Sequence, residues 1–277
     1  MNLFQSFLLG ILQGLTEFIP VSSSAHLLIG QRLLGIPASD AMFSFLVLVQ
    51  LGTVLALIIY FWKDLWRILL ATLSSIKQLT RHDGKMLNLD ARLGWYIIIA
   101  TIPALIFGYL LKSAVETLFK TPLLEAGIRL LITAVVLALA DWLSRPHLTL
   151  EKMTWLDALL IGIAQVLAVF PGASRSGTTI SAGMARGLDR PSAARFAFLM
   201  AIPVMLAAGG YQALDLFKLS GLGAFLPVLA VGFATAALVG WLAIKWLLNY
   251  LNKHSLYVFA LYCAALGVTV LIIQYVK

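Results

Sequence analysis

A carboxylate and an imidazole lie close together near the start of the chain, inside an otherwise apolar stretch. Gln13 and Glu17 are four residues apart, so a helix would place both side chains on one face. Pro20 follows, and after it the polar segment 22–26, which ends in His26. A carboxylate in apolar surroundings costs about 2.5–3.5 kcal/mol on membrane-insertion scales. Glu17 therefore needs a purpose: binding a divalent cation, acid–base chemistry, or capping the amides after Pro20.

The serines and the histidine of this segment have two interpretations. Ser23 and His26 offer a hydroxyl nucleophile with a base, or a histidine nucleophile with positioning hydroxyls such as Ser22. The structural alternative is a helix N-cap serine beside a buried, hydrogen-bonded histidine. The nearby Glu17 favours catalysis, whereas Gln13 is as well explained by an interhelical hydrogen bond.

A second polar segment, Pro171-Gly172-Ala173-Ser174-Arg175-Ser176-Gly177-Thr178-Thr179, interrupts another apolar stretch. Its glycines let backbone N–H groups approach an anion, and the helix that follows adds partial positive charge. The guanidinium of Arg175 grips two oxygens of a phosphate. The groups expected to bind phosphate beside it belong to Ser174, Ser176, Gly177, Thr178 and Thr179. The alternative is a structural Arg175–Glu17 ion pair, which can also form while no substrate is bound.

The elements that must position these groups are membrane helices. Of the 277 residues, 61% are hydrophobic and 12% are charged, and the mean hydropathy is +0.96. A soluble domain has about a quarter of its residues charged, so this composition excludes a water-soluble globule. Long apolar runs without period-2 alternation argue against a β-barrel. Six stretches approach the length of a bilayer span, at roughly 42–62, 94–111, 124–143, 194–215, 224–247 and 255–276.

Two further apolar regions, about 3–35 and 155–188, are interrupted by proline and polar residues. Irregular backbone at membrane depth persists only inside protein or beside a water-filled cavity. Both regions are therefore predicted to be re-entrant helical hairpins. The expected fold class is an all-α polytopic membrane protein with six transmembrane helices and two such hairpins.

An internal repeat relates the two halves of the chain. At an offset of 152, residues 8–24 and 160–176 are identical at 8 of 17 positions, including one glutamine and two serines. Each half holds one hairpin and three spans, and an odd number of crossings inverts the second half. We therefore predict a single membrane domain, 1–277, in which approximately 1–150 and 151–277 form an inverted-topology repeat.

Loop charges predict the orientation. The connection 63–92 carries six Lys or Arg against three Asp, so it should be cytoplasmic. The other connections expected on that side are 144–153, 186–193 and 248–254. Those expected outside are 112–122 and 216–223. The net charge of +8 is thus assigned to the membrane surface and not to nucleic acid. Three acids near span ends are expected to be solvated: Glu125, Asp141 and Asp157.

The first motif, from Gln13 to His26, together with the second, from Pro171 to Thr179, resembles the bacterial undecaprenyl-diphosphate phosphatases, also called bacitracin-resistance proteins. The resemblance covers the whole chain. It implies hydrolysis of a C55 polyprenyl diphosphate to the monophosphate, which recycles the lipid carrier for cell-wall synthesis and confers bacitracin resistance. It also implies an active site open to the outer face of the bacterial plasma membrane. The family's functional positions fall on Gln13, Glu17, Ser23, His26, Ser174, Arg175 and Thr179.

The resemblance further implies a divalent cation, Mg²⁺ or Ca²⁺, held by Glu17 with Gln13 as a neutral ligand. Gln13 stands where the family often has an acid. Glu17, Ser23, His26 and Arg175 are the expected catalytic residues, and the nucleophile is His26, Ser23 or water. The expected partners are the polyprenyl diphosphate lipid, the bilayer and a second copy in a homodimer. The rival function is a polyprenyl-phosphate or small-anion transporter or flippase, because inverted repeats with broken helices are typical of carriers.

Overall fold

A computed structural model of the chain describes residues 1–80, 87–111, 123–168, 174–215 and 222–276. Within these ranges the protein is all-helical, and its one β-type contact is an isolated bridge between Leu148 and Leu188. The helices are α1 Leu3–Phe18, α2 Ser23–Leu33, α3 Asp40–Tyr60, α4 Trp62–Thr80, α5 Leu89–Leu110, α7 Leu123–Leu143, the short 3₁₀ helix η1 Leu150–Lys152, α8 Trp155–Leu167, α9 Arg175–Ala185, α10 Arg190–Asp215, α11 Leu222–Leu251 and α12 Tyr257–Val276.

Six of the described helices are long and apolar enough to cross a membrane, which confirms the predicted number of spans. The qualifying segments are Ala41–Tyr60, Leu89–Leu110, Leu124–Leu143, Arg190–Leu214, Leu222–Leu251 and Tyr257–Tyr275. Large apolar side chains are exposed along these helices, as a lipid-facing surface requires.

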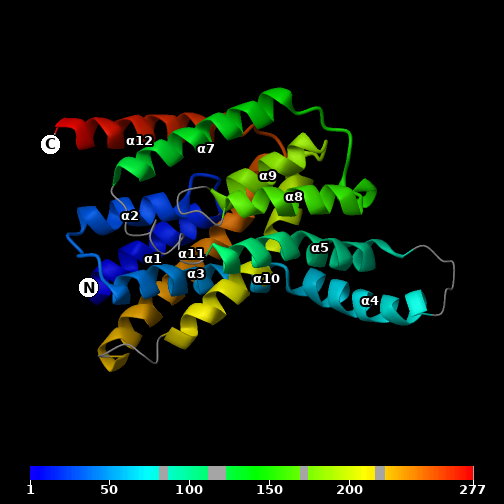
Figure 1. The fold of residues 1–277 in the computed structure, drawn as a ribbon, viewed down its shortest axis with the longest axis horizontal. Coiled ribbons are helices and arrows are strands. Elements are labelled where there is room, and N and C mark those ends of the chain that lie inside the picture. The colour runs from blue at the N-terminus through cyan, green and yellow to red at the C-terminus, as the bar shows by residue number, and fades with distance from the viewer. Residues whose placement is uncertain (81–86, 112–122, 169–173, 216–221, 277) are drawn as a thin grey trace.

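Two pairs of shorter helices occupy the regions predicted to be hairpins. The first pair is α1 and α2, of 16 and 11 residues, and the second is α8 and α9, of 13 and 11 residues. All four fall short of the ~20 residues of a full crossing. The two helices of each pair pack against each other, and Figure 1 shows α1–α2 toward the end that holds the N-terminus and α8–α9 apart from it. The re-entrant placement of the two pairs, and the inverted repeat, stay predictions.

Small residues let helices of the two halves approach closely. A Cβ added to Gly14 of α1 would lie 2.7 Å from the Val239 Cβ and 2.9 Å from the Ala236 carbonyl oxygen, both on α11. A Cβ added to Gly162 of α8 would lie 2.4 Å from the Ala100 carbonyl oxygen on α5. The first helix of each pair therefore packs against a long helix of the other half.

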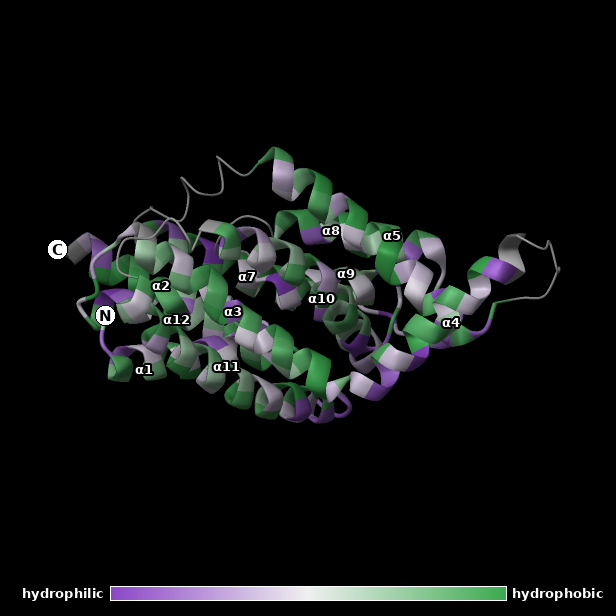
Figure 2. Cartoon of the chain, turned by 90° about the horizontal axis from the view of Figure 1, so that it is seen from below, coloured by the Kyte–Doolittle hydropathy of each residue, from purple (hydrophilic) through white to green (hydrophobic). Residues whose placement is uncertain are grey.

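The predicted cytoplasmic connection 63–92 contains the 19-residue helix α4. Its charges, which indicated a loop, lie on one side of an amphipathic helix that packs against α5. There the Trp95 Nε1 donates to the Ser75 Oγ at 3.0 Å. Figure 2 shows hydrophilic residues along α4, which extends away from the other helices.

Asp141 and Asp157 are buried, contrary to the expectation that both are solvated. The side chain of Asp141 is 0% exposed and that of Asp157 is 2% exposed. Arg190 Nε donates to Asp141 at 2.7 Å, and Arg186 Nε donates to Asp157 at 2.8 Å. Burial is tolerated because each carboxylate has a hydrogen-bonded guanidinium. Glu125 stays 34% exposed in its pair with a neighbouring arginine, in line with its prediction.

Candidate active site

Glu17 lies at the end of α1, where the helix stops two residues before Pro20. Its side chain is buried, and its Oε2 accepts two hydrogen bonds. Gln13 Nε2, one helical turn earlier, donates at 2.8 Å, and Ser23 Oγ, at the start of α2, donates at 2.7 Å. The predicted face of α1 is thus joined to the start of α2 through one carboxylate oxygen.

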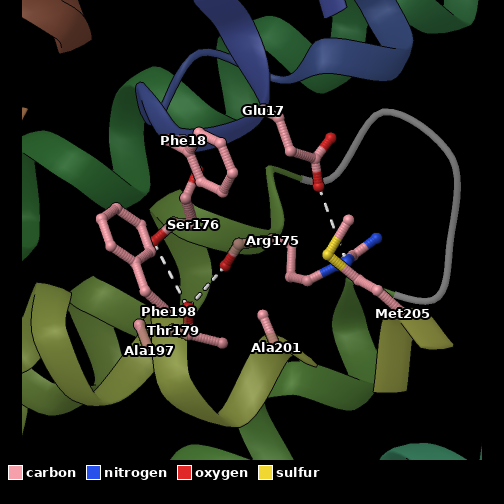
Figure 3. Close-up of a pocket in the computed structure, with 9 residues that line it drawn as sticks. All are labelled: Glu17, Phe18, Arg175, Ser176, Thr179, Ala197, Phe198, Ala201 and Met205. Carbon is pink, nitrogen blue, oxygen red and sulfur yellow. Dashed lines mark hydrogen bonds and ion pairs between the residues drawn. The ribbon is translucent and has the colours of Figure 1, made fainter. Parts of the chain in front are cut away.

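Arg175 is the first residue of α9 and reaches Glu17 from the second helix pair. Its Nη1 lies 3.6 Å from the Glu17 Oε1, which is an ion pair without a hydrogen bond. Ser174 is the N-cap of this helix and accepts from the Gly177 N–H at 3.0 Å. Figure 3 shows the Glu17 carboxylate pointing at the guanidinium of Arg175 across a pocket.

A small, partly open pocket lies between α1, α9 and α10. Its lining residues are Glu17, Phe18, Arg175, Ser176, Thr179, Ala197, Phe198, Ala201 and Met205. The α10 side is entirely apolar, and no sequence motif marked it. A polar end made by α1 and α9, with an apolar wall from α10, suits a ligand with a charged head and a hydrocarbon tail.

Two buried polar atoms at the site have no hydrogen-bond partner: the Gln13 Oε1 and the Arg175 Nη1. Leaving such atoms unpaired costs about 1–3 kcal/mol each. The Nη1 is a free donor suited to a phosphate oxygen, and the Oε1 is a free acceptor suited to a cation. An anion would satisfy the Arg175 Nη1, and a cation or a hydrogen-bond donor would satisfy the Gln13 Oε1.

The oxygens of Glu17 and Gln13 fit a divalent cation of the Mg²⁺ or Ca²⁺ type. Hard cations take oxygen ligands, and Mg²⁺ is commonly held by one or two carboxylates together with substrate phosphates. Among the described residues there is no group of three or more His, Cys, Asp or Glu side chains that could hold a metal. A cation here would therefore need oxygens from the substrate or from water.

His26 is buried in the first turn of α2, and its hydrogen bonds lead away from Glu17. Its Nδ1 lies 2.8 Å from the Ser22 carbonyl oxygen, and its Nε2 lies 2.8 Å from the Tyr262 hydroxyl on α12. Ser22 itself is buried and has a φ of 70°, a left-handed conformation that serine seldom adopts.

Only some of the other residues predicted in the second motif line the pocket. Ser176 and Thr179 line the pocket, where the Thr179 hydroxyl donates to the Arg175 carbonyl oxygen at 2.8 Å. The Gly177 N–H already donates to Ser174, so a phosphate would have to replace that bond. Thr178 is not among the residues that line the pocket. The predicted anion-binding residues 171–173 lie outside the described residues.

Two contacts of the site were missed from the sequence. Gln50, on α3, accepts from the Arg175 Nη2 at 3.4 Å, and Tyr262 reaches His26. Gln50 could have been noticed as a polar side chain in an apolar span. Such residues, however, often form only interhelical hydrogen bonds. For Tyr262 no signal in the sequence connects it with the motifs.

The sequence of this chain is similar to one protein family and to several named proteins. The profile of a family described as bacitracin resistance protein BacA matches residues 6–269. Proteins named undecaprenyl-diphosphatase are similar over nearly the whole chain. One from Chloroherpeton thalassium is 41% identical over 98% of this chain and 96% of its own length. One from Mycolicibacterium smegmatis is 43% identical, with coverages of 98% and 96%. One from Mycobacterium leprae is 43% identical, with coverages of 100% and 96%.

Proposed function

The chain belongs to the bacitracin resistance protein family, and we infer from this membership that it is an undecaprenyl-diphosphatase. It hydrolyses undecaprenyl diphosphate to undecaprenyl phosphate and inorganic phosphate. This reaction returns the lipid carrier to cell-wall synthesis and underlies resistance to bacitracin. The protein is a multi-pass membrane protein, and its substrate is a polyprenyl diphosphate lipid.

One observation carries the assignment of residues to this reaction: Glu17 of α1 and Arg175 of α9 line the same pocket. A diphosphate bound there would meet the guanidinium and its unpaired Nη1. Ser176 and Thr179 lie close enough to the same space to contribute hydroxyls. The apolar wall of α10 would face the beginning of the prenyl chain, whose remainder stays in lipid.

Of the three nucleophiles left open by the sequence, Ser23 has the most support. Its hydroxyl donates to the Glu17 carboxylate at 2.7 Å, which is the geometry of a nucleophile with an adjacent base. Attack of the Ser23 oxygen on the terminal phosphorus breaks the bond to the bridging oxygen and passes the hydroxyl proton to Glu17. Undecaprenyl phosphate leaves, and a phosphoserine remains.

Water then hydrolyses the phosphoserine, which restores the serine and releases phosphate. The imidazole of His26, three residues after Ser23 on α2, is the group proposed to take a proton from that water. Throughout, Arg175 neutralises charge on the transferred phosphoryl group, and positioning with charge stabilisation supplies most of the catalysis.

Gln13 and Glu17 would hold the divalent cation that the family resemblance implies. When bound, such an ion supplies charge neutralisation at the phosphate oxygens. The unpaired Gln13 Oε1 supports this role, because a cation would satisfy it.

The membrane arrangement is also part of the proposal. The two helix pairs α1–α2 and α8–α9 are re-entrant hairpins, related by the inverted repeat of approximately 1–150 and 151–277. The protein lies in the bacterial plasma membrane with its active site facing outward, and two copies form a homodimer. The packing of α1 on α11 and of α8 on α5 supports the repeat, because each half receives the other's hairpin.

Phosphate release tests the function directly. Purified protein in detergent is given undecaprenyl diphosphate, and inorganic phosphate and undecaprenyl phosphate are measured together. We expect both in equal amounts, loss of turnover with a chelator, and recovery on addition of Mg²⁺ or Ca²⁺. Absence of phosphate release with every divalent cation would contradict the function, and turnover insensitive to the chelator would contradict the cation.

The transporter alternative has no support from the comparisons, because the matched relatives are named as phosphatases. Sealed vesicles separate the two functions experimentally. A carrier would move labelled lipid phosphate across the bilayer without releasing phosphate from the diphosphate in detergent.

A further inference from the structure

His26 is held at both ring nitrogens by groups from different parts of the chain. Its Nδ1 lies 2.8 Å from the Ser22 carbonyl oxygen, four residues earlier. Its Nε2 lies 2.8 Å from the hydroxyl of Tyr262, 236 residues later, and the two rings are nearly parallel, at 9°. The proposed chemistry uses the imidazole but does not account for Tyr262.

The partners assign the tautomer of the imidazole. A carbonyl oxygen only accepts, so the Nδ1 must carry the hydrogen. Within the described part of the chain, no carboxylate is hydrogen-bonded to His26, so nothing there compensates a charged, buried ring. In the neutral ring the Nε2 keeps its lone pair, and the Tyr262 hydroxyl donates to it.

The two partners differ in their freedom to move. His26 is 7% exposed and is fixed by its own helix, whereas Tyr262 is 47% exposed on α12. Rotation of the tyrosine side chain would release the Nε2 without unpacking the buried residues around His26. The tyrosine is therefore the partner able to give way to another donor at the Nε2.

We propose that Tyr262 is a positioning residue for His26: its hydroxyl keeps the Nε2 unprotonated and aimed, and a water or substrate group replaces it during turnover. This inference rests on the proposed function, because it concerns the step in which the imidazole takes a proton from water. No bond forms or breaks at Tyr262 itself. Its hydroxyl returns to the Nε2 once the products have left.

A double-mutant cycle on phosphate release tests this role. The proteins are wild type, Tyr262→Phe, His26→Ala and the combination of both. Loss of one positioning hydrogen bond should lower kcat about tenfold and leave KM within about twofold, because substrate binding does not use it. In the His26→Ala background the same change should have no further effect, because the group that Tyr262 positions is gone.

Tyr257→Phe is the matched control, since Tyr257 begins the same helix and also loses only a hydroxyl. It should leave kcat and KM unchanged. A Tyr262→Phe protein with wild-type kcat would overturn the proposal, as would an undiminished tenfold loss in the His26→Ala background.

A spectroscopic measurement separates positioning from a general loss of structure. In protein labelled with ¹⁵N-histidine, the signals absent from His26→Ala report the His26 nitrogens. We expect a protonated Nδ1 and an unprotonated Nε2 in wild type, and a mixture of tautomers in Tyr262→Phe. Identical spectra for the two proteins would overturn the proposal. If wild type released no phosphate at all, the proposed function would fail while the spectra still tested the contact.

Discussion

At the scale of single residues, the two oxygens of Glu17 have different environments. The Oε2 accepts from Gln13 and Ser23, and the Oε1 faces the guanidinium of Arg175 at 3.6 Å. One oxygen is thus held by neutral donors, and the other is turned toward the cation of the second motif.

Ser23→Ala is the change that tests the proposed nucleophile. We expect phosphate release to fall by about two to four orders of magnitude, because the group paired with the Glu17 base is lost. Thermal unfolding should change little, because Glu17 keeps its hydrogen bond from Gln13. Ser74→Ala, an exposed serine on α4, is the control and should behave as wild type. Near-normal turnover of Ser23→Ala would assign the nucleophile to His26 or water.

The sequence predicted site residues where a charged side chain interrupts an apolar stretch. Glu17 and Arg175 are charged side chains in apolar stretches, which indicated a function for each, and the internal repeat with the family resemblance indicated that they act together. The contacts of Gln50 and Tyr262 were not predictable, because they join residues 125 and 236 positions apart and belong to no motif. The direction in which His26 points was also beyond the sequence, since it depends on the unusual φ of Ser22.

At the scale of elements, α1 positions the site by packing against α11. The contact depends on glycine, because a Cβ at Gly14 would lie 2.8 Å from the backbone nitrogen of Gly240. Glu17 lies three residues further along the same helix. A small shift of α1 would therefore move the carboxylate relative to Arg175.

Gly14→Ala tests this dependence. The added methyl group meets the Val239 Cβ and backbone atoms of α11, which cannot rotate away, so α1 must move. We expect a destabilisation of about 1–3 kcal/mol together with reduced phosphate release. The measurements are thermal unfolding in detergent and turnover of the same preparation. Gly210→Ala on α10 is the control, because a Cβ there meets no atom within 4 Å. Equal behaviour of the two variants would show that the α1–α11 contact does not position Glu17.

The elements themselves were largely predictable from apolar run length and from breaks at proline. The exception is α4, whose charges at Lys63, Asp64 and Arg67 suggested a loop. The ion pair of Asp64 with Arg195, at 2.7 Å, ties the start of this helix to α10. Such long-range pairs, like the burial of Asp141 and Asp157, depend on which helices become neighbours, and loop charge alone does not specify that.

At the scale of the whole molecule, α10 connects the elements that form the site. It packs against α3, α5 and α9, and it supplies the apolar wall of the pocket. The helices that carry Glu17 and Arg175 belong to opposite halves of the chain, so neither half holds the complete pocket. The pocket that contains Glu17 and Arg175 therefore forms only when both halves of the chain have folded together.

The proposed orientation predicts which ends of α11 are reachable from outside. In a Cys263→Ala background, a cysteine at Gly223 should react with a membrane-impermeant maleimide in intact cells. A cysteine at Asn252, directly after the other end of α11, should react only after the cells are opened. Both positions are exposed, so access differs only by side of the membrane. The reverse pattern would place the active site toward the cytoplasm.

The central claim is that Glu17 and Arg175 act on one diphosphate, and a double-mutant cycle on phosphate release tests it most directly. Glu17→Gln and Arg175→Lys are compared with their combination, and Glu151→Gln and Arg145→Lys, at exposed positions, serve as controls. Each site variant should lose about two or more orders of magnitude in kcat, and the double variant should lose little more than the worse single variant. Losses that multiply, or near-normal turnover in either single variant, would contradict a shared site.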